Sequence, residues 1–289
     1  MRFGISTHLF HDERLQQPHF DRLAAQGFEL VEVFATRAHL NYHDDRRILE
    51  VRQAIDAAGL GAWSVHAPIA ETFVKGTWGR PYSIASTDPA VRQEAVDESS
   101  AAIRAAGQLG CAVVVMHLGI PREQRVPPGD NDAASASRSL EVLARACESA
   151  GVRLALELIP NHLSTAEALV GWLDGDLDVG STGACLDVGH AHLSGGAPEA
   201  AELLSGYIAT THVHDNRGRR DDHLVPFDGA VDWPATLMTL SKVGYAGPLV
   251  FEVPDHGNAE VTLARTVTAR AKIRAILDDL ERPFTFEEA

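Results

Sequence analysis

Short apolar runs that end in a metal-binding side chain recur along this chain of 289 residues. Each run has the composition of a buried strand, as in AVVVMHL, LALELIP and PLVFEVP, with a histidine or carboxylate at or near its end. Side chains spread over so many strands can meet only if the strand ends converge, as they do in a parallel β/α barrel. The side chains of this kind are His66, His117, Glu157, Asp187, His190, His212, Asp221, His223 and Glu252.

The segments between these runs have helical length and periodicity, which predicts repeated βα units around a parallel sheet. We expect strands at 2–6, 28–34, 61–66, 111–117, 152–158, 183–187, 208–213 and 248–253. We expect helices at 18–26, 45–58, 88–109, 133–150, 164–174, 197–205, 232–243 and 259–279. The sequence therefore predicts an α/β protein with one domain over residues 1–289, a single (β/α)8 TIM barrel.

Two connections exceed the usual length, at 67–87 and 118–132, and each follows a run that ends in histidine. The first contains Phe73, Trp78 and Tyr82, a composition suited to covering a polar ligand. Long barrel loops commonly carry function, and plain surface decoration is the alternative for both segments.

Charge and composition limit the class of protein. The 40 acidic and 25 basic residues give a net charge of −15, which disfavours nucleic acid as a partner unless a basic rim or bound cations reverse the sign locally. No apolar run approaches the roughly 18 residues of a membrane helix, and the first residues lack the pattern of a signal peptide. Three cysteines without metal spacing indicate a reducing compartment, so we expect a cytoplasmic protein.

Five of the 14 histidines fall near the amino terminus. We interpret them as surface or loop residues, of which at most one or two lie near the barrel mouth. They are His8, His11, His19, His39 and His43.

Glu157 and Glu252 are carboxylates inside apolar strands, where an unpaired charge is costly. A divalent cation would compensate them, and an ion pair with arginine inside the barrel is the alternative. Asp187 and His190 have D-x-x-H spacing after a strand, so both can address one cavity, the aspartate as a ligand and the histidine as a ligand or hydrogen-bond donor.

His212 and His214 share one face of their strand because side chains alternate with a period of two. The D-x-H pair of Asp221 and His223 is a weak signal by itself and gains weight from its position after HVHDN. The chain lacks the motifs of serine nucleophiles, nucleoside-triphosphate sites and dinucleotide sites.

The motifs CLDVGH, HVHDN followed by DDH, and GYAGPLVFEV resemble those of the xylose isomerase-like barrels over essentially the whole chain. That superfamily includes sugar epimerases, inosose dehydratases, hydroxypyruvate isomerases and apurinic endonucleases of the endonuclease IV type. The resemblance to its sugar isomerases implies one divalent metal held by Glu157, Asp187, His212 and Glu252. It also implies that the two glutamates form the acid/base pair.

The endonuclease branch of that superfamily uses nine ligands for three metals, and all nine residue types are present here. A phosphodiesterase acting on abasic DNA is therefore a second hypothesis. Several relatives have lysine two places after the metal histidine, where this chain has His214. We interpret His214 as a replacement proton carrier.

We therefore expect a divalent-metal-dependent sugar or keto-polyol isomerase or epimerase, in which Glu157 and Glu252 transfer a proton through an enediolate while His190 and His214 assist. A keto-sugar dehydratase or lyase is the nearest variant. The expected metal is Mn²⁺, with Mg²⁺, Co²⁺ or Zn²⁺ as alternatives. The expected partner is a small sugar or polyol, without nucleic acid or membrane, and formation of a homo-oligomer stays open. Further metals or substrate would contact His66, His117, His190, Asp221 and His223.

Overall fold

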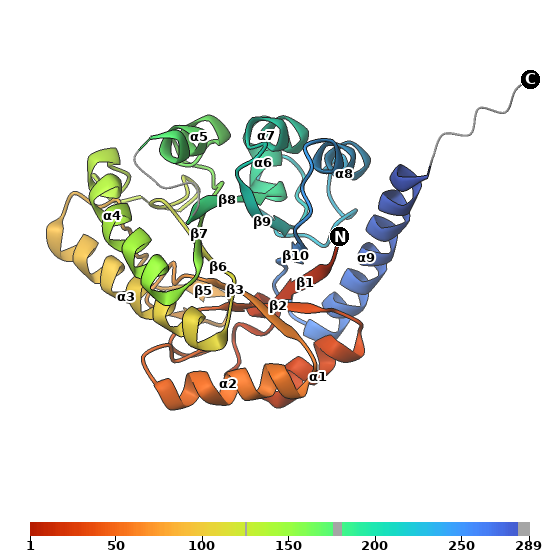
Figure 1. Ribbon diagram of the computed structural model, residues 1–289, viewed down its shortest axis with the longest axis horizontal. Helices are drawn as coiled ribbons and strands as arrows, with labels where there is room; N and C mark the ends of the chain where they lie inside the picture. The colour runs from red at the N-terminus through yellow and green to blue at the C-terminus, as the bar shows by residue number, and fades with distance from the viewer. Residues whose placement is uncertain (125, 176–180, 283–289) are drawn as a thin grey trace, which may run out of the picture.

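A computed structural model of the chain describes residues 1–124, 126–175 and 181–282. Eight of the strands in these ranges pair in parallel and close into a barrel (Figure 1), which confirms the predicted TIM barrel. Their order around the barrel is β1 (Phe3–Ser6), β2 (Leu30–Phe34), β3 (Gly61–His66), β6 (Val113–Met116), β7 (Arg153–Glu157), β8 (Thr182–Asp187), β9 (Ile208–Val213) and β10 (Leu249–Phe251), which pairs with β1.

Most of these strands are buried on both faces, which explains why their sequences are nearly continuous apolar runs. Val113, Val115, Ala155 and Cys185 form a small apolar cluster of their own, separate from the main core. They alternate along β6, β7 and β8, so they belong to one face of the sheet, the barrel interior. Continuing each strand by two residues from Val115, Ala155 and Cys185 reaches His117, Glu157 and Asp187, which therefore share that inner face at the carboxyl end.

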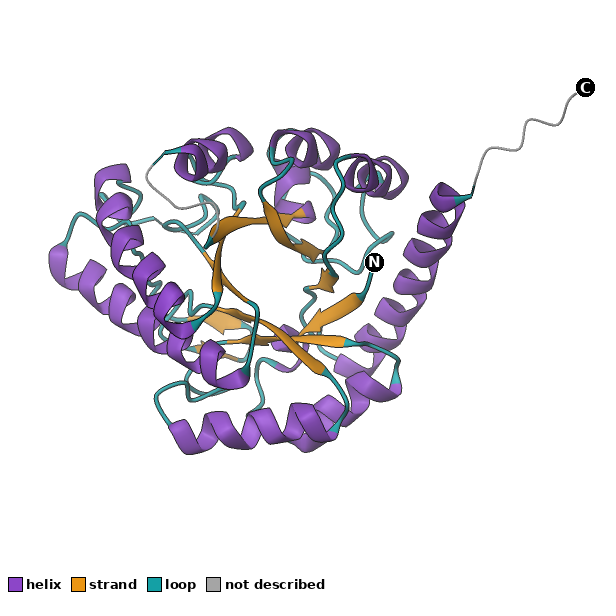
Figure 2. Cartoon of the chain, in the orientation of Figure 1, coloured by secondary structure: helices purple, strands orange, loops and turns teal. Residues whose placement is uncertain are grey.

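Helices cover the outside of the barrel (Figure 2). A representative helix, α4, buries Ala136, Leu140, Leu143 and Cys147, which fall on one face at helical spacing. The outer helices are α1 (Gln17–Ala25), α2 (Asp45–Ala57), α3 (Pro89–Leu109), α4 (Ala133–Ala150), α5 (Ala166–Asp174), α7 (Ala197–Leu203), α8 (Trp233–Lys242) and α9 (Ala259–Glu281). All of them overlap the predicted helices, so the alternation of βα units is confirmed.

Two short helices were not predicted, and both begin directly after a strand. They are the 3-10 helix η1 (Thr7–Phe10) after β1 and α6 (Val188–Leu193) after β8. The Asp187 side chain starts α6 by accepting a hydrogen bond from the His190 backbone N–H at 2.7 Å. His8 lies in η1 and His190 lies in α6, so these short helices fix both histidines next to the ends of their strands.

The long segment 67–87 contains a hairpin of β4 (Phe73–Val74) and β5 (Thr77–Trp78). Lys75 and Gly76 connect these strands with φ values of 48° and 74°. Two consecutive positive φ values define the tight turn that matches the twist of a hairpin, and glycine at the second place makes it accessible. The segment is therefore a folded cover over the barrel mouth.

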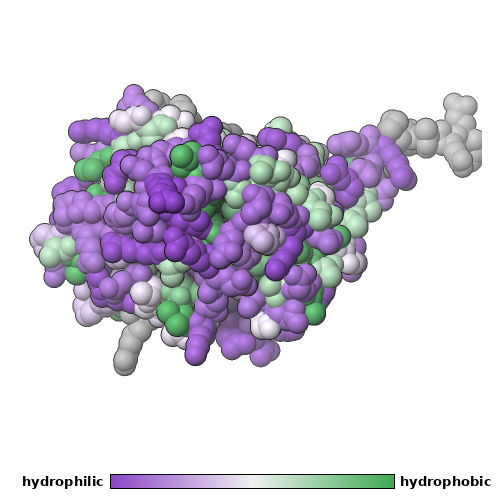
Figure 3. Space-filling view, turned by 90° about the horizontal axis from the view of Figure 1, so that it is seen from below, coloured by the Kyte–Doolittle hydropathy of each residue, from purple (hydrophilic) through white to green (hydrophobic). Residues whose placement is uncertain are grey.

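The outer faces of the helices form much of the molecular surface and are mostly polar (Figures 2 and 3). Figure 3 shows one face that is largely hydrophilic, with apolar residues scattered between polar ones. Exposed apolar side chains such as Leu49, Val142 and Met238 lie on different helices. None of the helices in the described ranges combines the length and apolar character needed to cross a bilayer.

Candidate metal and substrate site

The carboxyl ends of the strands bring the predicted ligands together. His66, Glu157 and Asp187 are the last residues of β3, β7 and β8. His212 pairs with Asp187 across β8 and β9, and Glu252 directly follows β10. Strand register, rather than loop conformation, therefore sets their relative positions.

The central group consists of Glu157, Asp187, His212 and Glu252, whose ligand atoms all lie within 4.8 Å of one another. Nδ1 of His212 lies 2.9 Å from a Glu157 oxygen, 3.4 Å from a Glu252 oxygen and 3.8 Å from an Asp187 oxygen. Three carboxylates and one imidazole form a donor set that Mn²⁺ and related divalent cations accept. The predicted metal ligands thus converge, and their role as ligands stays a prediction.

Glu32 on β2 is a fourth buried carboxylate, and sequence reasoning missed it. It accepts hydrogen bonds from Nε2–H of His212 at 3.0 Å and from the Ser64 hydroxyl at 2.7 Å. This contact fixes the His212 tautomer and leaves the Nδ1 lone pair facing the central group. A charge inside the apolar run LVEVF was the signal, and it is the same signal that identified Glu157 and Glu252.

A second group shares Glu157 with the first. Oε2 of Glu157 lies 3.1 Å from Nε2 of His66 and 2.9 Å from Nε2 of His117. Nδ1–H of His66 donates to the Ala67 carbonyl at 2.8 Å, so its Nε2 presents a lone pair to Glu157. His66, His117 and Glu157 are thereby placed as three donors around one point.

A third group lies around Asp221, whose Oδ2 is 3.0 Å from Nε2 of both His190 and His223. Nδ1–H of His190 donates to the Leu158 carbonyl, and that of His223 donates to the Glu252 carbonyl. His223 has a φ of 42°, a left-handed backbone conformation that is costly for a residue with a side chain. The contacts of His223 with the Glu252 carbonyl and with Asp221 hold it in this conformation, with its ring lining the cavity.

The second and third groups share a pattern that fits divalent cations. In His66, His190 and His223, the Nδ1–H donates to a backbone carbonyl while Nε2 faces a carboxylate. Two acceptors that face each other repel unless a cation or an added proton lies between them. Metal-binding histidines characteristically donate their second N–H in this way.

The charges of the groups are strongly coupled. Burial opposes ionisation of Glu157, but the imidazoles of His212 and His117 outweigh it and hold the pKa of Glu157 well below its ordinary value. Burial likewise opposes protonation of His212, and the surrounding groups, Cys185 and Glu252 first, raise its pKa well above the ordinary value. Protons on histidine thus balance the carboxylates wherever no cation does.

His214 is fully buried. Its Nε2–H donates to Asp187 at 3.0 Å, and its ring stacks on that of His223 with centroids 3.8 Å apart. Within the described residues its Nδ1 has no hydrogen-bond partner. His214 is thus placed to orient Asp187, and its role as a proton carrier stays a prediction.

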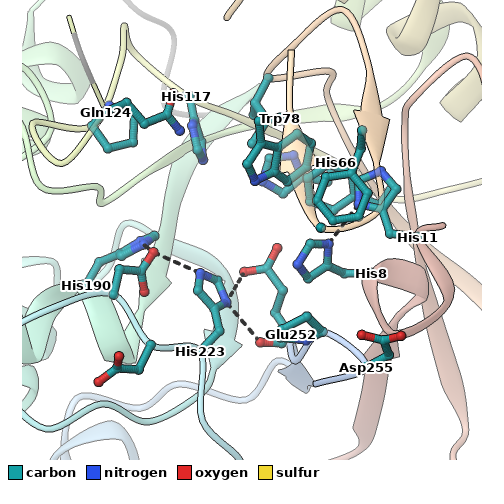
Figure 4. Close-up of a pocket in the computed structure, with 18 of the residues that line it drawn as sticks. His8, His11, His66, Trp78, His117, Gln124, His190, His223, Glu252 and Asp255 are labelled. Atoms are coloured by element: carbon teal, nitrogen blue, oxygen red, sulfur yellow. Dashed lines mark hydrogen bonds and ion pairs between the residues drawn. The ribbon is translucent and has the colours of Figure 1, made fainter. Parts of the chain in front are cut away.

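A cavity of about 400 Å³ opens above these groups (Figure 4). Seven residues of the predicted set line it, whereas Asp187 and His212 lie deeper and are fully buried. The seven are His66, His117, Glu157, His190, Asp221, His223 and Glu252. The opposite wall comes from the first part of the chain: His8, His11, Phe34, Phe73 and Trp78.

Both long segments contribute to this cavity, and the first does so through aromatic side chains, as its composition suggested. Phe73 and Trp78 of the hairpin line it, and so do Pro121 and Gln124 of the second segment. Tyr82 does not line the cavity and instead packs beneath the Arg80 guanidinium.

The interpretation of the amino-terminal histidines as surface or loop residues was wrong for His8 and His19, which are buried within helices. His11 and His39 lie in turns, as a loop position requires, but are buried as well. The expectation that at most two of the five lie near the barrel mouth is right, because His8 and His11 are the ones that line the cavity. His8, His11, His19 and His39 are buried, and His43 is exposed. The cause is long-range, because η1 turns the chain inward after β1, and the hairpin and β2 then cover its histidines. The available signal was the position of His8 near the carboxyl end of its strand, where His66 and His117 also lie.

These features define a (β/α)8 barrel protein with a histidine and carboxylate centre at the carboxyl ends of its strands. The chain belongs to the xylose isomerase-like TIM barrel family, whose model matches residues 20–277. The membership confirms the family resemblance that the motifs carried.

Among curated proteins, it is 30% identical to an uncharacterized protein of Sinorhizobium fredii over 73% of this chain and 72% of the relative. It is 28% identical to an uncharacterized protein of Methanocaldococcus jannaschii over 87% of this chain and 83% of the relative.

Among solved structures, a D-tagatose 3-epimerase-like protein is similar with a TM-score of 0.78 and 25% identity, over 97% of this chain and 98% of the other. A 3-keto-D-glucoside 4-epimerase from E. coli has a TM-score of 0.74 and 20% identity, over 95% of this chain and 99% of the other. Because the E. coli epimerase is only 20% identical to this chain, its likeness shows the fold alone.

Proposed function

We propose that this protein is a divalent-metal-dependent isomerase or epimerase of sugars or keto-polyols. The observation that carries the proposal is the central group, in which Glu157, Asp187, His212 and Glu252 bring their ligand atoms within 4.8 Å at four adjacent strand ends. The cavity above has a volume of about 400 Å³, which suits a small molecule. The similar solved structures named as sugar epimerases support the same class.

A divalent ion in the central group would polarise neighbouring carbonyl and hydroxyl oxygens of a sugar and lower the cost of enediolate charge. Glu157 and Glu252 both line the cavity, so each can reach a carbon next to that carbonyl. One glutamate removes the proton from that carbon, and the other returns a proton to the opposite face. His212 and Asp187 lie below them and would hold the ion in place.

The first prediction tests these roles. Glu157→Gln and Glu252→Gln keep the size of each side chain but remove the basic oxygen, so we expect each to lower kcat at least about 100-fold. Turnover is measured on a panel of free ketoses and keto-glycosides with added Mn²⁺. Glu260→Gln is the control, because this glutamate is exposed and pairs with Arg22 on the surface. Epimerisation at the wild-type rate in both glutamine variants would overturn the assignment.

A multi-metal phosphodiesterase is the second candidate, and a specific observation favours it. The groups around Glu157 and Asp221 offer donors for further cations, and multi-metal sites hold phosphates and activate water. The net charge of −15 disfavours a polyanionic substrate.

Metal analysis separates the two candidates. Protein purified without chelator is expected to hold one tightly bound equivalent as a sugar isomerase and about three as a phosphodiesterase. Incubation with an abasic-site duplex is the functional counterpart. Clean incision together with no turnover of any ketose would reverse the ranking.

A further inference from the structure

His8 and His11 form a hydrogen-bonded pair on the cavity wall that no metal group uses. Their Nδ1 atoms lie 2.9 Å apart, and Nε2 of His11 lies 3.0 Å from the Thr36 hydroxyl (Figure 4 shows the histidine pair). His8 belongs to η1, and His11 ends it. A short chain of hydrogen bonds therefore runs from Thr36 to the edge of the cavity.

Aromatic side chains hold both rings in place. The His11 ring stacks on Phe73 with centroids 4.5 Å apart, and the His8 ring lies parallel to Trp78 within 4°. Phe34 contacts both histidines from β2. The orientation of the pair is thus fixed by the hairpin on one side and the barrel on the other.

Both histidines are neutral near pH 7. Burial and the neighbouring histidines lower the pKa of His8 well below its ordinary value, and burial and His8 do the same to His11. A neutral imidazole has one N–H and one lone pair, so a single proton lies between the two Nδ1 atoms. If His8 supplies it, Nε2 of His8 is an acceptor; if His11 supplies it while accepting from the Thr36 hydroxyl, Nε2 of His8 is a donor.

Nε2 of His8 has no hydrogen-bond partner among the described residues, and the ring points into the cavity on the side of Glu252 (Figure 4). A group that can either accept or donate matches an oxygen that is a hydroxyl in one form of a substrate and a carbonyl in the other. Lysine and arginine are absent from the described residues that line the cavity, whereas Asp12 and Asp255 are present. Acidic side chains without nearby cationic ones disfavour a phosphate group at this wall.

We propose that His8, oriented by His11 and Thr36, binds a hydroxyl or carbonyl oxygen of an uncharged polyhydroxy substrate at the wall that faces Glu252. The inference rests on the proposed function and deepens it. In this arrangement His8 touches substrate, while His11 and Thr36 are positioning residues. The substrate would lie between the metal centre, which acts on the carbonyl, and His8, which selects the position of a second oxygen.

The test compares His8→Phe, Thr36→Val and Thr36→Ser with the wild-type protein. His8→Phe keeps a ring between Trp78 and Phe34 but removes Nε2, and Thr36→Val removes only the hydroxyl at the far end of the chain. KM and kcat are measured on the preferred free ketose, and Mn²⁺ affinity is measured by calorimetry. His162→Phe is the control, because His162 is exposed and outside the cavity.

We expect His8→Phe to raise KM about 10-fold, as for a lost substrate hydrogen bond, with unchanged Mn²⁺ affinity. Thr36→Val should raise KM roughly 3-fold, and Thr36→Ser should restore the wild-type KM. An unchanged KM in His8→Phe, or a weakened Mn²⁺ affinity in that variant, would overturn this inference and leave the proposed function standing. A wild-type protein that neither binds nor converts any ketose would overturn the proposed function and this inference with it.

Discussion

At the scale of single residues, Glu32 decides how His212 is oriented. Its carboxylate holds Nε2–H of His212, which leaves Nδ1 for the central group. The residue is fully buried, so its charge is felt at short range and in a medium that screens it weakly.

Glu32→Gln is therefore expected to weaken Mn²⁺ binding roughly 10-fold or more, because the neutral amide stabilises the imidazole less. Isothermal titration calorimetry of the metal-free protein measures the change directly. Glu29→Gln, an exposed substitution beyond the other end of the same strand, should leave the Kd unaltered. Equal affinities in the Glu32 and Glu29 variants would show that Glu32 has no part in orienting the ligand.

At the level of residues, the convergence of polar groups that interrupt apolar strands at their carboxyl ends could be predicted from the sequence, and their roles stay predictions. Glu157, Asp187 and Glu252 were found in this way because strand period and barrel convergence are local and regular. Glu32 carried the same signal inside LVEVF and was missed. The tautomers and the pairing of His8 with His11 depend on segments distant in the sequence, so no local pattern could show them.

At the scale of elements, a network around Glu98 ties α3 to the connection between β2 and α2. Its carboxylate accepts hydrogen bonds from the Tyr42 hydroxyl at 2.6 Å and from Nε2–H of His43 at 3.0 Å, and it pairs with the Arg37 guanidinium. Burial alone would raise the pKa of Glu98, but these three partners outweigh it and lower the pKa from 4.5 to about 2.

A carboxyl group whose pKa is lowered by folding stabilises the folded state at pH values above its unfolded pKa. This stabilisation is lost as the pH falls through the pKa of the folded state. Glu98→Gln is therefore expected to cost roughly 1–3 kcal/mol of unfolding free energy at pH 7 and much less near pH 2. Urea denaturation of both proteins across this range is the measurement. A difference that stays constant from pH 7 to pH 2 would contradict the ionic origin of the effect.

Element prediction from sequence was right for the eight barrel strands and the outer helices, because each has a clear period and a glycine or capping residue at its ends. Gly110 and Gly151, for instance, end α3 and α4 in the left-handed conformation. The short helices η1 and α6 escaped because a single turn has no period to recognise. The hairpin of β4 and β5 escaped because its strands are two residues each.

At the scale of the whole molecule, a bound cation would join four neighbouring strands, β7 to β10. A ligand that binds the folded state but not the unfolded state stabilises the fold by mass action. The gain is about 2.7 kcal/mol when the free ligand concentration is 100 times the Kd. We therefore expect Mn²⁺ to raise the Tm and a chelator to reverse the rise, as read by differential scanning calorimetry. Asp187→Asn should abolish most of this response; a shift of the same size in that variant would place the ion elsewhere.

The central ligands lie between Glu157 and Glu252, whereas the facing wall comes from residues before about 80, counting His8 to Trp78. Under the proposed function, the central ligands and the wall that would select the substrate therefore come from separate stretches of the chain. Substitutions in the first stretch are then expected to change which substrate is accepted while the central group stays intact. Glu32 and His66 are the exceptions, since both lie in the first stretch but contact His212 and Glu157 of the reactive centre. A chimera that imports residues 1–80 from a relative should acquire that relative's preference only if Glu32 and His66 are retained.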